Sequence, residues 1–172
     1  MPNTYSLISS NVLSSSAASV TFSSIPATFT DLVLRVTCRN TTNSYNYTLS
    51  VGGSAGQYSE TEIHADGASS TGSTRTSNTD PFGTTSYLFG VASGDTANTF
   101  GVSEIYIPSY TASQNKPVSL VSFRERNSAS LGISGIAGLF RNTSAISTIT
   151  ATSAGTAFAI GSSFYLYGIK NS

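Results

Sequence analysis

The chain has 172 residues, which is enough for one domain with a substantial core. It contains 33 Ser and 23 Thr, 9% charged residues and a formal net charge of zero, whereas an average soluble domain has about 25% charged residues. The neutral balance predicts neither a nucleic-acid partner nor a charged membrane surface, and nine Tyr and nine Phe argue against a disordered chain.

The termini and the cysteine content set further limits. The sequence opens without a basic segment followed by an apolar one, so no signal peptide is expected. No apolar run approaches the roughly 20 residues of a membrane helix. Cys38 is the single cysteine, which excludes an intrachain disulfide framework.

Apolar and polar residues alternate along most of the chain, and a period of two predicts β-strands. The clearest stretch is 32–39, where Leu32, Leu34, Val36 and Cys38 share one face. Similar alternation predicts strands at 20–23, 45–51, 104–107, 118–126, 133–140, 146–152 and 164–169. Eight to ten strands at such spacing predict an all-β fold, a two-sheet antiparallel sandwich that is jelly-roll-like.

Two segments interrupt this pattern within the single domain expected for residues 1–172. Residues 67–85 are Ser, Thr, Gly and Asn with hardly an apolar residue before Phe82, so we expect a long surface loop there. Residues 1–11 are candidates for an N-terminal arm that docks on a capsid or on a sister subunit.

The densest polar cluster is Glu60, Glu62, His64 and Asp66. On a strand these four side chains point to one face, and carboxylates with an imidazole can hold a divalent cation. The alternative, which we weigh more heavily, is a solvated strand face with no ion. Ligands two residues apart lie about 7 Å apart along a strand, so convergence on one ion requires a bend or a second segment.

An enzymatic reaction is not expected. His64 is the single histidine, so a Ser-His-Asp site would depend on it, and no G-x-S-x-G turn occurs in the sequence. A carboxylate pair for glycoside hydrolysis stays open, because the separation of two carboxylates is a property of the folded chain. No cofactor is expected either.

Several polar and aromatic residues are candidates for contacts with a ligand or another subunit. Arg124 and Arg126 should share one strand face with Phe123 on the other, and the alternative to a contact role is an ordinary polar face. Most tyrosines lie in strand patterns and are expected in the core. Tyr58, Tyr87 and Tyr110 lie nearer loops and are the better contact candidates.

Three segments resemble a family of small virion structural proteins of tailed phages, of the cyanophage and aquatic-phage type. These segments are Tyr5 to Ser10 with Ser19 to Pro26 and Phe29 to Leu34, Asn98 to Tyr110, and Ala145 to Thr150 with Ser163 to Lys170. The resemblance implies a place in the virion, made in the host cytoplasm and carried on the outer surface. It implies no catalytic residue.

Three functions follow as hypotheses, the first weighed most heavily. The first is a capsid decoration or cement protein on the outer head surface, which bridges capsomers of the major capsid protein. The second is a receptor-binding module of a tail or head fibre that binds host-surface glycan. The third is a hydrolase. For the first two we expect a homo-oligomer, with a trimer as the first expectation and a dimer as the alternative.

Overall fold

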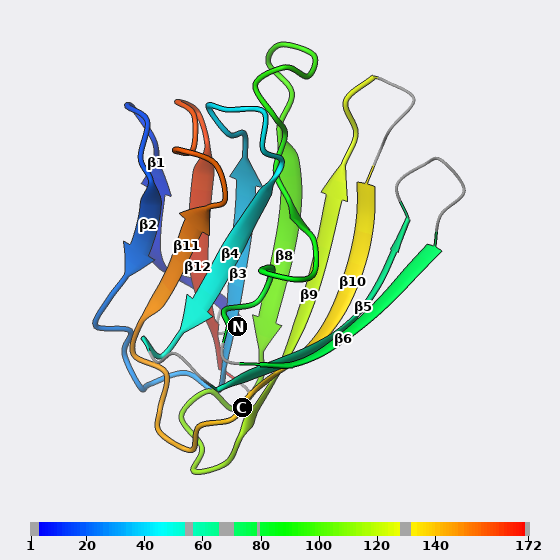
Figure 1. The fold of residues 1–172 in the computed structure, drawn as a ribbon. Helices are drawn as coiled ribbons and strands as arrows, with labels where there is room; N and C mark the ends of the chain where they lie inside the picture. Colours follow the sequence, from blue (N-terminus) through cyan, green and yellow to red (C-terminus); the bar gives the residue numbers. More distant parts are fainter. Residues whose placement is uncertain (1–3, 54–56, 66–70, 79, 128–131, 171–172) are drawn as a thin grey trace.

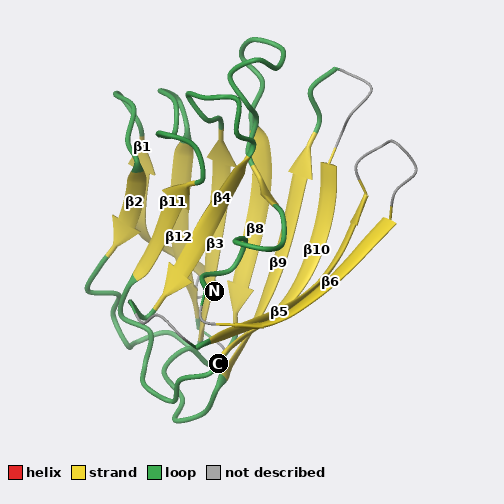
Figure 2. Cartoon of the chain, in the orientation of Figure 1, coloured by secondary structure: helices red, strands yellow, loops and turns green. Residues whose placement is uncertain are grey.

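The computed structural model describes residues 4–53, 57–65, 71–78, 80–127 and 132–170, with 71–78 described by their backbone alone. The regular elements among these residues are all β-strands, arranged in two facing antiparallel sheets (Figures 1 and 2). The larger sheet has eight strands in the order β1 (Tyr5–Val12), β12 (Ser163–Ile169), β3 (Asp31–Cys38), β8 (Gly101–Ile107), β9 (Lys116–Arg124), β10 (Gly132–Phe140), β5 (Tyr58–Ala65) and β6 (Thr71–Asn78). The smaller sheet has four strands in the order β2 (Ser19–Phe22), β11 (Ile149–Ser153), β4 (Asn46–Val51) and β7 (Leu88–Phe89).

Eight of the twelve strands follow jelly-roll topology. In that fold a long antiparallel hairpin wraps round itself, so that strands pair from the two ends of the chain inward. Here β1 pairs with β12, β2 with β11, β3 with β8 and β4 with β7. These four pairs alternate between the two sheets, and the all-β sandwich predicted from the sequence is confirmed.

Two hairpins are inserted into this framework. The β5–β6 hairpin lies between β4 and β7 in the chain, and β9–β10 lies between β8 and β11. Both add to the same edge, beyond β8, where β10 pairs with β9 on one side and with β5 on the other. The larger sheet therefore gains four strands at this edge, which form the right side of the view in Figure 1, and β7 of the smaller sheet packs on β8, β9 and β10.

The core lies between the two sheets and follows from the period-two pattern. Leu34 and Val36 of β3 face Leu49 of β4, and Phe158 and Phe164 fill the space near β12; all five are buried. A buried aliphatic or aromatic side chain of this kind stabilises the fold by about 1.5–3 kcal/mol. Gly52, at a φ of 68°, ends β4 in a left-handed turn.

The eight strands predicted from alternation all correspond to strands of the structure, with ends shifted by a few residues. Two expectations were wrong. Residues 5–11 are not a separate arm, because they form β1 and pair along their length with β12. The segment 67–85 is not one long loop, because its residues 71–78 form β6 and its Phe82 is buried; residues 1–3, 66–70 and 79 lie outside the described part.

Both ends of the described chain lie together at one end of the sandwich. Tyr5 of β1 pairs with Ile169 of β12, and in Figure 1 both end labels lie in the lower half of the view. The connections from β1 to β2, from β3 to β4, from β7 to β8 and from β11 to β12 lie at the opposite end.

Candidate functional site

The carboxylate row of β5 is covered by the segment that leads into β7 and is not a solvated face. Glu60 and Glu62 are buried, and both bind the chain segment that leads into β7. Glu60 accepts hydrogen bonds from the Gly83 N–H (3.2 Å) and the Thr85 hydroxyl (3.0 Å). The covering segment brings backbone N–H groups out of water, and each of them needs a hydrogen-bond acceptor. The two carboxylates of β5 supply these acceptors.

Glu62 joins three elements. Its Oε1 accepts from the Tyr87 N–H (2.9 Å) and from the Ser134 hydroxyl of β10 (2.8 Å), and its Oε2 lies 3.4 Å from Nδ1 of His64. The shared face of Glu60, Glu62 and His64 is thus as predicted. The described residues contain no group of three or more His, Cys, Asp or Glu side chains placed to hold a metal ion, and Asp66 lies outside them.

Arg124 and Phe123 point the opposite way from the sequence-based expectation. Arg124 is buried between the sheets, with its guanidinium 4.1 Å from the centre of the Tyr45 ring and 4.9 Å from that of Phe89. These are cation–π distances. Phe123 faces outward and is half exposed. Arg126 lies beyond the end of β9 and pairs with Asp95 instead (2.5 Å), so the two arginines do not form one site.

The three tyrosines predicted as contact residues differ in their surroundings. Tyr58 and Tyr110 are buried, and burial raises the pKa of both hydroxyls. The Tyr58 hydroxyl donates to the Val51 carbonyl (2.9 Å), and that of Tyr110 donates to the Pro26 carbonyl. Both therefore belong to the core and not to a contact surface. Tyr87 is half-buried, stacked on Phe89 at a centroid distance of 5.4 Å.

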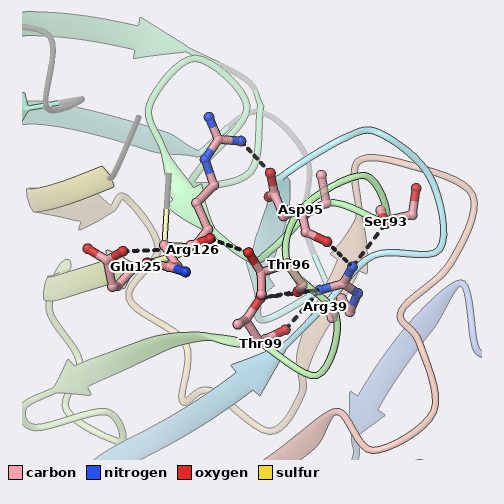
Figure 3. A network of polar contacts seen from close by, with 9 residues as sticks. Arg39, Ser93, Asp95, Thr96, Thr99, Glu125 and Arg126 are labelled. Carbon is pink, nitrogen blue, oxygen red and sulfur yellow. Dashed lines mark hydrogen bonds and ion pairs between the residues drawn. The ribbon is translucent and has the colours of Figure 1, made fainter. Parts of the chain in front are cut away.

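An ordered polar loop connects β7 to β8 at the end opposite the termini (Figure 3). Arg39 donates to the backbone carbonyls of Thr96 (2.8 Å), Ser93 (2.9 Å), Asp95 (3.0 Å) and Thr99 (3.2 Å). The Thr96 hydroxyl also donates to the Arg126 carbonyl (2.7 Å). The Arg39 guanidinium thus donates to four carbonyls that would otherwise accept hydrogen bonds from water. These bonds hold the loop in one conformation.

The feature that the sequence did not reveal is the outer face of the extended sheet, which carries large apolar side chains on four neighbouring strands. The exposed fractions are 50% for Val102, 37% for Val121, 46% for Phe123, 48% for Ile133 and 67% for Ile63. Single exposed apolar residues are normal, but a contiguous group is typical of an interaction surface. We call this surface the assembly face.

The strand register arranges the assembly face in three rows that run across the strands. The bulky row contains Val102, Phe123 and Ile133. The central row, two residues further along each strand, contains Glu104, Val121, Gly135 and Ile63. The shallow row contains Tyr106, Ser119 and Ala137.

A pocket of about 340 Å³ opens at the shallow row. It is lined by Tyr106, Pro108, Pro117, Ser119, Ala137 and Gly138 among others. The floor is low because Ser119 and Ala137 have short side chains, and the Tyr106 wall is fixed by a hydrogen bond from its hydroxyl to Asp31 (2.9 Å). The pocket lies on the same face as the bulky row, since Tyr106, Pro117, Ser119 and Ala137 are all exposed there.

Charge is nearly absent from this face. Among the exposed, outward-facing described residues of β3, β8, β9, β10 and β5, the charged ones are Arg35 and Glu104. They pair with each other at 2.9 Å, from the Arg35 Nε to the Glu104 Oε2. Asp31, at the start of β3, also lies on this side of the sheet, but it is buried and accepts hydrogen bonds from the Tyr106 hydroxyl and the Ser109 N–H. The exposed surface of the face is therefore apolar with no net charge, and it suits an apolar partner better than a charged one.

Comparison with protein-family models, with curated proteins and with solved structures found no match to this chain. Among the described residues there is also no helix with the length and hydropathy to cross a membrane.

Proposed function

We propose that this protein is a virion structural protein of a tailed phage, specifically a capsid decoration protein that stabilises the outer head surface. The observation that carries the proposal is the assembly face. A sheet face with five exposed apolar side chains and a single internal ion pair gains stability when another subunit covers it. A subunit of a symmetric shell has such neighbours.

The fold and the composition are consistent with this role. Jelly rolls form viral capsid proteins as well as lectins, so the fold alone does not assign the function. A charge content of 9% suits a chain whose surface is covered by neighbours. The resemblance to small virion proteins adds the phage setting, and homo-oligomers are the expected state in a symmetric particle.

The test is reconstitution on capsids prepared without this protein. Purified protein is added to such capsids, and its occupancy on the lattice and the temperature of capsid rupture are measured. We expect stoichiometric binding to the head surface and a higher rupture temperature. Protein that leaves the lattice empty at saturating concentration would remove the decoration role.

A second function, glycan binding at a fibre tip, is favoured by the Arg39-held loop. This loop lies at the end opposite the termini, and ligand sites tend to occupy loops that a rigid scaffold positions. Binding of purified host-surface polysaccharide to the wild-type protein, weakened by Arg39→Gln, would support this reading over decoration. Equal binding by both proteins, or none, would remove the loop as the site.

A further inference from the structure

We propose that the assembly face binds a second copy of this chain, as a two-fold dimer in which Phe123 and Ile133 of each copy fill the shallow row of the other. The inference rests on the proposed function in one respect, since it names what covers the face. It replaces the trimer expected from virion symmetry with a two-fold contact on this surface.

The shape of the assembly face favours this two-fold arrangement. The bulky row and the shallow row flank the central row at equal spacing, two residues to either side on β8, β9 and β10. In the dimer the sheets of the two copies stack face to face. They are related by a two-fold axis that lies midway between the sheets and runs along the central row, and rotation about this axis reverses the strand direction. It therefore places Phe123 over Ser119 and Ile133 over Ala137 of the second copy, where the 340 Å³ pocket lies. Stacked sheets lie about 10 Å apart, which is the space that such side chains fill.

The polarity of the assembly face favours contact with a second copy. On the axis itself the central row brings Val121 and Ile63 against their own counterparts, which are apolar contacts. Glu104 also approaches its counterpart, but each Glu104 carries Arg35 at 2.9 Å, so the two carboxylates meet as neutralised pairs. An exposed surface without net charge is complementary to itself, whereas it offers no opposite charge to an acidic or basic partner.

The polar side chains in this part of the sheet point inward, which also favours a covered outer face. Behind the bulky row the inward side chains are Arg124, Ser122 and Ser134. Each has a partner on this inner side: Ser122 accepts from the Phe89 N–H at 2.6 Å, Ser134 donates to Glu62 at 2.8 Å, and Arg124 lies over the Tyr45 ring. This part of the sheet thus carries polar groups inside and apolar groups outside. That distribution reverses the usual one and is the pattern of a face that is buried in the assembled state.

The first experiment measures mass in solution by sedimentation equilibrium. We expect wild-type protein at twice the chain mass of 17.8 kDa and the double variant F123E/I133E at the mass of one chain. A matched control is I160E, because Ile160 is 63% exposed on the β11–β12 connection and belongs to none of the three rows of the assembly face. The control should remain a dimer, and circular dichroism should show both variants folded.

A second experiment tests the orientation through cysteine pairs and a short bismaleimide that spans about 10 Å, the separation of stacked sheets. Cys38 is buried and does not compete. V121C alone should cross-link, because both copies place this residue on the axis. F123C alone should not, since its two copies are about 13 Å apart along the strand in addition to the sheet separation. A mixture of F123C and S119C should cross-link.

The outcomes separate this inference from the proposed function. Wild-type protein that stays monomeric but binds capsids overturns the dimer and leaves the decoration role. A dimer that does not bind capsids supports the dimer and removes the decoration role. A trimer, a dimer that I160E disrupts while F123E/I133E does not, or cross-linking of F123C alone overturns the two-fold arrangement.

Discussion

The neighbours Phe123 and Arg124 show at single-residue scale how this protein departs from an ordinary sandwich. Arg124 lies inside over two aromatic rings, and Phe123 lies outside. Burying an arginine costs free energy unless it is compensated, and an exposed Phe gives up the stabilisation of a buried one, about 1.5–3 kcal/mol. The rings of Tyr45 and Phe89 compensate the buried guanidinium, and the exposed Phe123 regains its burial free energy in the proposed dimer.

Cys38 provides a residue-scale prediction about the core between the two sheets. Burial raises the pKa of its thiol from 9.0 to about 12, so the thiolate that reacts with disulfide reagents is scarce in the folded state. We expect a thiol reagent at pH 8 to label Cys38 at least about a hundred times more slowly in native than in denaturant-unfolded protein. The measurement is the absorbance of the released thiolate over time.

The same shift makes folding stability depend on pH in a stated direction. The thiol pKa is higher in the folded state than in the unfolded state, so its contribution to stability is full below about pH 9 and is lost as pH rises toward 12. Rapid labelling of native protein at pH 8 would contradict the buried position of Cys38.

At the scale of elements, the sequence predicted most strands of the jelly roll, because alternation is strong where one face of a strand is buried. It failed in β9, where the apolar positions change face along the strand. Val118 and Leu120 point inward, but Val121 and Phe123 point outward. The pattern read from Phe123 and Arg124 alone gave the wrong face, and the phase set by Val118 would have given the right one.

The strand β6 and the burial of the β5 carboxylates were missed for a different reason. The segment 67–85 has almost no apolar residue, so no periodicity predicts β6, which is held by backbone pairing with β5. Likewise, the carboxylates of β5 were expected in solvent, because the segment that covers them, Gly83 to Tyr87, is far along the chain. Non-local coverage of this kind leaves no trace in a local pattern.

β8 allows a prediction at the element scale, because its two faces have opposite roles. Ile105 and Ile107 are buried in the core. Replacing both with Asp should unfold the protein, since each loss costs about 2–5 kcal/mol before the buried charge is counted, against a total of about 5–15 kcal/mol. V102D changes the outer face of the same strand and should stay folded. Thermal melts followed by circular dichroism distinguish them, and a cooperative native-like melt of the double variant would contradict the assignment of faces.

At the scale of the whole molecule, the eight jelly-roll strands and the two inserted hairpins have separate roles. The jelly roll encloses the aliphatic and aromatic core, with the chain ends together at one end. The hairpins extend the larger sheet and, with β8, carry the assembly face. This division means that the contact surface can change without disturbing the core, because its side chains point away from the core.

The near absence of charge on the assembly face predicts how the whole molecule associates. A contact held by apolar burial weakens on cooling and has a negative heat capacity change. With Arg35 and Glu104 already paired within each copy, the dissociation constant should change less than about threefold between 50 and 500 mM salt, whereas an interface held by charge steering weakens steeply. Dilution calorimetry at several temperatures and salt concentrations measures both effects, with F123E/I133E as the blank. Dimers that dissociate with added salt, or that tighten on cooling, would require charged contacts elsewhere on the surface and would remove the assembly face as the dimer interface.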